Sequence, residues 1–404
     1  AYIANGKTLE FYIPKLKTPE EASLIQKTIT FVLDQMGISQ EDRKHVKLTL
    51  MVETFEACVK VEKMIAALRP YISAVNFGRW DMLFDLNKTL SRCTRLSSAF
   101  RDMESKAVIA AQLRVIAAAE KFGICAEGGM SGVVLESDPD LRKKQLAAVI
   151  SDKLRELLLG FKAAWVAQPD PHLVSAIETV FSQDDQRLLE LLDTYKDLLD
   201  TSLVNKVREF ISLGRPAPRI SDEAINLAAL TADFDHSPEN FTQKDFNNFI
   251  RISYQYRAGM YLGIGAVNVD GNMIDEAVEE ILMQLSHHWI HRNVTLSDTK
   301  TTANTDDALR YSHEALQEKF QSGSIRGFET YASNPELRLR VDQSMLDAEN
   351  SIRAALKNPS LAFTSEYGIP LLCNEEQRNV LAQSQVFPRV RDLIRDTLTL
   401  KSKL

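Results

Sequence analysis

The chain has 404 residues, 45% of them hydrophobic and 25% charged, and a formal net charge of −7 at pH 7. This composition is typical of a globular protein that is long enough for two domains. No block of Lys and Arg is interleaved with aromatic residues, so we expect no nucleic-acid binding. We expect no membrane span either, because no uncharged apolar run approaches the roughly 20 residues that cross a bilayer.

The four cysteines, Cys58, Cys93, Cys125 and Cys373, are scattered without C-x-x-C spacing. This pattern predicts neither a disulfide framework nor a zinc site, and it fits reduced thiols in an intracellular compartment. The first residues, AYIANGKTLEF, lack the charged-then-apolar pattern of a signal peptide.

Alternation of apolar runs and helical segments begins near the N-terminus. LEFYIP at residues 9–14 predicts a strand, and residues 19–36 predict a helix with Pro19 in its first turn. The next unit, residues 46–81, consists of an apolar run, a segment with helical spacing of its apolar residues, and a second apolar run. Strand, helix, strand is the prediction for this unit.

Each of these two runs ends in an acid, Glu53 after the first and Asp81 after the second. In a parallel α/β barrel, chemistry is done at the face where the strands end. Two carboxylates with room for waters and substrate oxygens suit Mg²⁺, which keeps part of its water shell. The alternative is that both acids only occupy helix starts, where negative charge is favoured.

The same alternation continues to about residue 171. Residues 106–122 predict a helix, GICAEGGM predicts a strand that ends in the paired Gly128 and Gly129, and Asp138 with Pro139 opens a long helix. AAWVAQPDP at residues 163–171 is another apolar run stopped by turn residues. Repeated apolar runs and helices predict a parallel α/β sheet.

Beyond residue 182 the pattern is helical, and the GRPAP segment at 214–218 marks the predicted domain boundary. We predict a TIM-type (β/α)8 barrel over residues 1–213 and an all-helical domain over 214–404. The expected helices there are residues 246–262, 275–291, 305–320, 334–356 and 376–398. Only about five strands are evident where a closed barrel needs about eight. We therefore expect the barrel to be incomplete at its N-terminus or to contain cryptic strands.

The C-terminal tripeptide Ser402-Lys403-Leu404 is the signal read by the peroxisomal import receptor. It predicts a peroxisomal or glyoxysomal location and the import receptor as a partner. The sequence leaves the oligomeric state open.

Several motifs resemble the malate synthase family, whose members condense glyoxylate with acetyl-CoA. VETFEA followed by AVNFGRWD resembles a pair of family segments, and FYIPK, GGMSG and AWVAQPD continue the likeness. ISYQYRAGMYLGIGAVNVDGNMIDEAVEE resembles the family's later QY segment and its M-x-D-x-A motif. The order and spacing of these motifs agree over most of the chain.

The resemblance implies a role for each matching residue. Glu53 and Asp81 become Mg²⁺ ligands, and Asp275 becomes the general base that removes a methyl proton from acetyl-CoA. Substrate-binding residues by the same comparison are Gly78, Arg79, Trp80, Gly128, Gly129, Met130 and Trp165, and acetyl-CoA-binding residues are Pro169 and Met273. From the residues alone, Asp275 could instead be the N-cap of the helix that follows it.

Two departures accompany the likeness. The family has an Arg on its first barrel strand, in an RPRGWH-like segment before FYIPK, and this chain has no such segment. The chain is then either part of a longer protein or a naturally short homologue. Gln168 also stands where the family usually has His.

Three functions follow from the resemblance and its departures. The first is malate synthesis in the glyoxylate cycle. The second is a related Mg²⁺-dependent lyase or thioesterase that acts on malyl-CoA-like compounds. The third is a homologue with impaired catalysis and a binding or structural role.

Overall fold

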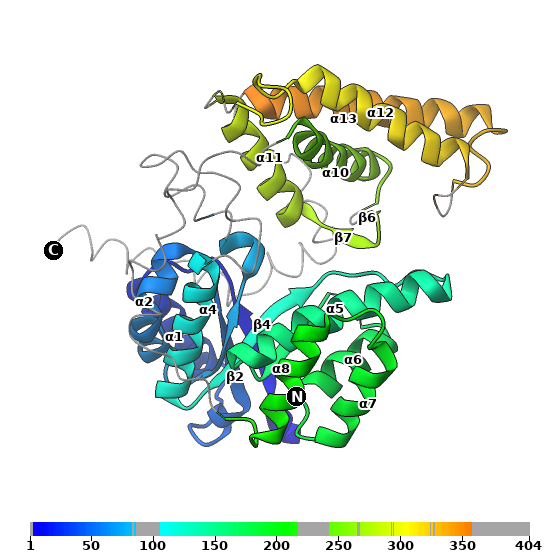
Figure 1. Cartoon of the computed structure of the whole chain (residues 1–404). Coiled ribbons are helices and arrows are strands. Elements are labelled where there is room, and N and C mark those ends of the chain that lie inside the picture. Colours follow the sequence, from blue (N-terminus) through cyan, green and yellow to red (C-terminus); the bar gives the residue numbers. More distant parts are fainter. Residues whose placement is uncertain are drawn as a thin grey trace.

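The computed structural model describes residues 3–82, 85, 106–167, 169–216, 242–264, 267–291, 293, 295–323, 325 and 328–357. Within these ranges the chain forms a curled parallel sheet with covering helices and a separate group of helices. Figure 1 shows the helical group above the barrel part, with a short hairpin on the side of the group that faces the barrel part. No helix in the described ranges is long and apolar enough to cross a membrane.

The barrel part alternates strands and helices as the sequence predicts. Its elements are η1 (Ile3–Asn5), β1 (Leu9–Ile13), α1 (Pro19–Gln35), η2 (Asp42–His45), β2 (Val46–Val52), α2 (Phe55–Ala67), β3 (Ile72–Phe77), α4 (Lys106–Phe122), β4 (Cys125–Ser131), α5 (Pro139–Leu159), β5 (Ala163–Val166), α6 (Pro171–Phe181), α7 (Asp185–Tyr195) and α8 (Thr201–Ser212).

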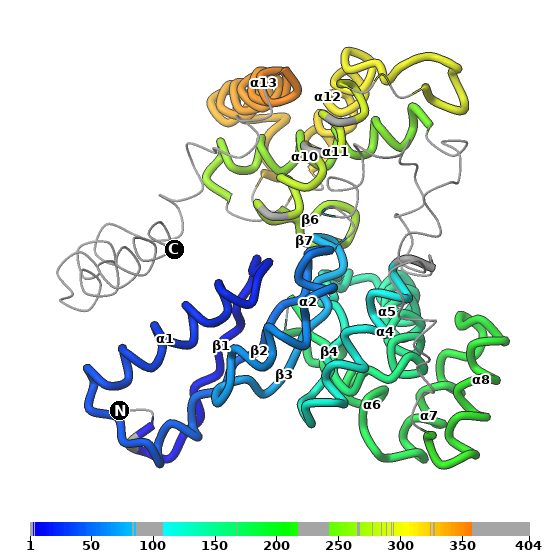
Figure 2. Tube along the Cα trace, turned by 90° about the vertical axis from the view of Figure 1, so that its left-hand side faces the viewer, coloured from blue at the N-terminus to red at the C-terminus, as the bar shows by residue number. Residues whose placement is uncertain are grey.

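The five strands follow one another in the order β1-β2-β3-β4-β5, and all pairs are parallel. The sheet is strongly curled. Its two edge strands come close together, since Tyr12 on β1 contacts Trp165 on β5 edge to face, with 5.2 Å between the ring centroids. The tube view in Figure 2 follows this curved succession of strands. The described part of the fold is therefore a half-barrel with the five strands that the sequence indicates.

Burial along β2 alternates with period two and explains why this segment is a strand. Leu48, Leu50 and Val52 are fully buried on the outer face, where α2 and its neighbours pack, while Thr49 and Met51 face the partly open interior. Such alternation assigns one face to the hydrophobic core and the other to the barrel interior.

The C-terminal part is helical apart from one small hairpin. Its elements are α10 (Gln243–Tyr261), β6 (Val267–Val269), β7 (Asn272–Ile274), α11 (Glu276–His291), α12 (Thr305–Gln321) and α13 (Pro335–Lys357). The helices share a core of their own, centred on Phe246, Tyr254 and Met345. The predicted helices at 246–262, 275–291, 305–320 and 334–356 are thus confirmed, and residues 376–398 lie outside the described part.

The β6–β7 hairpin joins the two parts of the chain. Its Asp270-Gly271 turn has positive φ at both residues, as a tight hairpin requires. Gly271 O accepts a hydrogen bond from Val134 N at 2.7 Å, and Met273 N donates to Gly132 O at 2.9 Å. The hairpin is therefore fastened to the segment just after β4, at the carboxyl end of the sheet.

Candidate functional site

Glu53 and Asp81 lie together at the carboxyl ends of β2 and β3, as their sequence positions predict. A single cation, the ammonium of Lys15 just after β1, contacts both of them: Lys15 Nζ lies 3.5 Å from Glu53 Oε2 and forms an ion pair with Asp81 Oδ1. The Lys15 backbone N–H also donates to Glu53 Oε1 at 2.5 Å. Three consecutive strands thus deliver their end residues to one point.

The local structure decides how far the two acids act as helix-start residues. Thr54, not Glu53, is the N-cap of α2, and its side chain accepts from Ala57 N at 3.1 Å. Asp81 does lie in the first turn of a helical segment that begins at Arg79. Asp81 therefore does lie at a helix start. Glu53 does not cap a helix, so helix capping does not explain why a carboxylate is buried at this position.

Gly78 is what lets the end of β3 approach Glu53 so closely. A Cβ at position 78 would lie 2.6 Å from Glu53 Cβ, and Gly78 N donates to Val52 O at 3.1 Å. Real Cβ atoms do not approach that closely, so a larger residue here would push the two strand ends apart.

The environment of Glu53 opposes its negative charge. The side chain is 1% exposed, and burial, with the nearby Asp81 charge, raises its pKa to about 7, while Lys15 acts in the opposite direction. A carboxylate in this position is stabilised by an added cation.

The donor set fits a hard divalent cation. No cluster of three or more His, Cys, Asp or Glu side chains that could hold a metal occurs among the described residues. Mg²⁺ is commonly held by one or two carboxylates and otherwise by waters and substrate oxygens. The Lys15 ammonium occupies a position between Glu53 and Asp81, and the two carboxylates are ligands of the kind that Mg²⁺ accepts.

Arg79, for which the family resemblance predicts a role in substrate binding, turns away from the acidic pair. Its guanidinium donates twice to Asp152 on α5, at 3.1 and 2.5 Å. A Cβ on Gly129 would lie 2.7 Å from Arg79 Nε. The side chain therefore fastens the Gly78–Asp81 turn to β4 and α5.

Two fully buried charges lie next to this link. Lys153 Nζ donates to Glu156 Oε2 at 2.9 Å and to Gly129 O at 2.6 Å, and Gly129 N donates to Glu156 Oε1 at 3.0 Å. The β4–β5 register shifts between Gly128 and Ser131. The side chains of α5 thus satisfy backbone groups of Gly129 at the irregularity, as buried polar groups require.

The remaining residues of the predicted substrate set lie in different surroundings. Trp165 points into the barrel interior, where its Nε1 donates to Glu127 Oε2 at 2.6 Å. Trp80 and Met130 are exposed large side chains. Pro169 is exposed one residue before Asp170, the N-cap of α6. Gln168 and the terminal Ser402-Lys403-Leu404 lie outside the described residues.

Asp275 follows the hairpin that is fastened to the end of β4. Its Oδ1 accepts from Val278 N at 3.0 Å, so it caps the start of α11. Glu280, on the same helix, is acted on by the charges of Lys15 and Asp81, with burial as the main cause of its raised pKa. The first turns of α11 thus lie within electrostatic range of the acidic pair.

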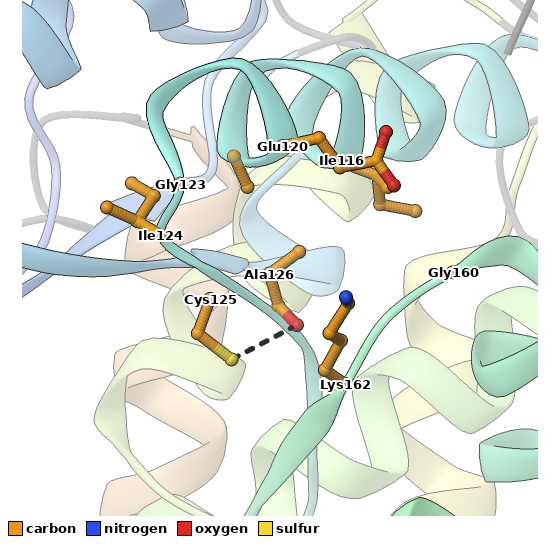
Figure 3. A pocket seen from close by; sticks show the side chains of 9 residues that line it. Ile116, Glu120, Gly123, Ile124, Cys125, Ala126, Gly160 and Lys162 are labelled. Atoms are coloured by element: carbon orange, nitrogen blue, oxygen red, sulfur yellow. Dashed lines mark hydrogen bonds between the residues drawn. The ribbon is translucent and has the colours of Figure 1, made fainter. Parts of the chain in front are cut away.

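A separate cavity of about 460 Å³ lies at the opposite end of the strands. Figure 3 shows Glu120, on α4, and Lys162 among the residues that line it, together with Cys125, the first residue of β4. Burial raises the pKa of the Cys125 thiol, which opposes thiolate chemistry. Because Glu53 and Asp81 follow the other ends of their strands, this cavity does not contain the acidic pair.

Several residues of the site were not found from sequence. The segment FYIPK contains no pattern that predicts the contacts of Lys15. Lys153 and Glu156 have the i, i+3 spacing of an ordinary exposed ion pair, so nothing in the sequence predicts their burial. The hairpin did have a signal, because Asp-Gly between short alternating segments is a common hairpin turn.

Three comparisons with known proteins bear on this geometry. Residues 1–197 match the family model described as "Malate synthase, TIM barrel domain". Malate synthase A of Escherichia coli is 28% identical over 74% of this chain and 51% of its own. Glyoxysomal malate synthase of Ricinus communis is 24% identical over 85% of this chain and 58% of its own.

The chain spans about half the length of the curated relatives that it matches. Among solved structures, a citrate lyase from Burkholderia xenovorans overlaps 54% of this chain and 68% of its own, at 18% identity and a TM-score of 0.34. That likeness is too weak to bear on function.

We expect Lys153→Met to lower the free energy of unfolding by about 3 kcal/mol or more, because it leaves the buried Glu156 carboxylate without its cation. Chemical denaturation measures the change. Lys60→Met removes the partner of Glu56 in an i, i+4 pair at the surface and should cost less than about 1 kcal/mol. Equal effects of the two substitutions would contradict this account of Lys153.

We expect Glu53→Gln to stabilise the metal-free protein at pH 8 but not at pH 4. Because the pKa of Glu53 rises from 4.5 to about 7 on folding, the wild-type chain loses stability as the pH rises through that window. The variant lacks this titration, so its advantage at pH 8 should be about 3 kcal/mol. Denaturation in the presence of a chelator at both pH values tests this, and a pH-independent difference would argue against it.

Proposed function

Because residues 1–197 belong to the malate synthase barrel family and homology to malate synthases extends over most of the chain, we propose that this protein condenses acetyl-CoA with glyoxylate to give malate and CoA. The observation that most supports the proposal is the convergence of Glu53 and Asp81 on one cation position at the carboxyl ends of β2 and β3. The whole activity is a proposal, since the chain spans about half of its relatives' length.

In this proposal, Glu53 and Asp81 hold Mg²⁺. When bound there, the ion supplies positive charge that polarises the aldehyde of glyoxylate. The turn from Gly78 to Asp81 receives the glyoxylate carboxylate, because N–H groups at the start of a helical segment favour anions. Arg79 holds this turn against α5 through Asp152 and so limits its movement.

Asp275 is the proposed general base. Its carboxylate takes a proton from the methyl group of acetyl-CoA, and the resulting enolate carbon bonds to the aldehyde carbon of glyoxylate. The π bond of the aldehyde opens onto its oxygen, which takes up a proton and becomes the hydroxyl group of the product. Water then cleaves the thioester of the product, which releases CoA and leaves malate. One oxygen of Asp275 accepts from Val278 N. Capping therefore orients the carboxylate and leaves its second oxygen for the proton.

The position of Asp275 supports this assignment. Met273, two residues earlier, donates its N–H to Gly132 O just after β4. The charges of Lys15 and Asp81 also act on the carboxyl group of Glu280, on the following helix. The base thus comes from the C-terminal part and the metal ligands from the barrel part. Small movements between the two could open and close the site around substrate.

We expect the chain to release CoA from acetyl-CoA only when glyoxylate is present, and Asp275→Asn to abolish that release. Asn caps helices about as well as Asp, so the substitution should leave α11 intact. Thiol detection of CoA measures the rate, and Asp200→Asn, at the N-cap of α8, is the matched control.

Three outcomes distinguish the candidate functions. Cleavage of malyl-CoA without condensation of acetyl-CoA and glyoxylate would support the lyase or thioesterase alternative. Absence of release in the wild-type chain would favour a binding or structural homologue. A wild-type rate for Asp275→Asn would contradict the assignment of the base.

We further propose a peroxisomal location through Ser402-Lys403-Leu404, supported by glyoxysomal malate synthases among the relatives. A fusion with a fluorescent protein at the N-terminus should enter peroxisomes of eukaryotic cells. Deletion of Leu404 should leave the fusion in the cytosol, and unchanged import would contradict the proposal.

A further inference from the structure

Lys15 has an unusual backbone for a lysine. It follows β1 with φ of 63°, in the left-handed region that side chains other than glycine seldom adopt. Non-glycine residues in this region cost on the order of 1 kcal/mol and are concentrated at functional sites. The surrounding structure therefore keeps the Lys15 backbone in a left-handed conformation that is unfavourable for a lysine on its own.

This backbone conformation gives Lys15 two contacts at once. Its N–H donates to Glu53 Oε1 at 2.5 Å, and its Nζ reaches back to Asp81 Oδ1 and lies 3.5 Å from Glu53 Oε2. Glu53 is buried, but the Lys15 side chain is 58% exposed. The backbone contact thus orients Glu53, while the ammonium stays free to leave.

The charges around this point do not balance. When both Glu53 and Asp81 are ionised, their two carboxylates face one ammonium, which leaves one negative charge, and Glu280 adds a further acidic group nearby. A divalent cation between the two acids would neutralise them completely. The ammonium would then be a surplus positive charge at the same place, repelled by the ion.

We propose that Lys15 is an exchangeable internal cation of this site: its ammonium neutralises Glu53 and Asp81 in the metal-free protein, gives way to the divalent ion, and then binds the carboxylate of the 2-oxo acid. This inference rests on the proposed function. Lysine suits the exchange because its charge is compact and its four-carbon stem is flexible.

The exchange has a consequence for the order of binding. Before the metal enters, the Lys15 ammonium is held by Glu53 and Asp81, and the site repels an anion. Once the metal is bound, the acids are neutralised and the ammonium offers one positive charge to a monocarboxylate. Metal should therefore bind first, and the anionic substrate should bind weakly without it.

Isothermal titration calorimetry of Lys15→Met tests both halves of the exchange. We expect Mg²⁺ to bind the variant about tenfold more tightly, because no ammonium competes for the two acids. At saturating Mg²⁺, glyoxylate should bind the variant about tenfold more weakly, because the anion loses its counter-charge. A purely structural ion pair would not shift the two affinities in opposite directions.

Three further variants make the result specific. Lys15→Asn is a second neutral variant that tolerates the left-handed backbone, and it should reproduce the shifts if Lys15→Met folds poorly. Lys17→Met removes a nearby exposed lysine, 3.6 Å from Asp85, and should change neither affinity. Glu53→Gln should abolish Mg²⁺ binding.

Equal Mg²⁺ affinity in the wild-type chain and in both neutral Lys15 variants would overturn the exchange while leaving the proposed function intact. Weaker Mg²⁺ binding in those variants would also overturn it, since Lys15 would then support the metal site. Absence of Mg²⁺ binding in every chain, the wild type included, would overturn the metal site itself and the exchange with it.

Discussion

The parallel arrangement of β1, β2 and β3 is the constraint on which the rest of the site depends. Strands that run in the same direction end at the same edge, so the residues that follow them must meet there. Lys15, Glu53 and Asp81 each follow one of these strands and meet through hydrogen bonds and ion pairs. Because Glu53 is buried, its negative charge is unfavourable there unless a positive charge lies close to it.

The rigidity of the site comes from the neighbouring strand and helix. Where β4 departs from regular pairing, Lys153 and Glu156 on α5 satisfy the backbone of Gly129. Arg79 binds Asp152 on α5 and so holds the turn after β3 against the same helix. These charges lie outside the acidic pair, and they position the backbone that frames it.

The hairpin gives the C-terminal part a defined place at the same edge of the sheet. Hydrogen bonds from Val134 and to Gly132 fasten β6 and β7 to the end of β4. Asp275 follows directly, at the start of α11. An acid from the helical part thereby follows the hairpin that is bound at the edge of the sheet where the barrel part presents its own acids, and the proposed condensation of two substrates relies on this arrangement.

Much of this protein was determined by its sequence alone. The strand at β2, the helix at 106–122 and the helix start at Asp138 were predicted from neighbours along the chain, and each was confirmed. The positions of Glu53 and Asp81 at strand ends followed from the same local patterns. The short strands β6 and β7 were missed, although their Asp-Gly turn is a local signal.

Only the tertiary structure decided which charges meet. Lys15 and Asp81 are far apart in sequence, and nothing local distinguishes Lys15 from an exposed lysine. Lys153 and Glu156 look like an ordinary surface pair and are buried instead, and Arg79 turns to Asp152 rather than to the acids. The physical reason is that local patterns record which face of an element is apolar, whereas charge pairing depends on the curl of the sheet and on long-range packing.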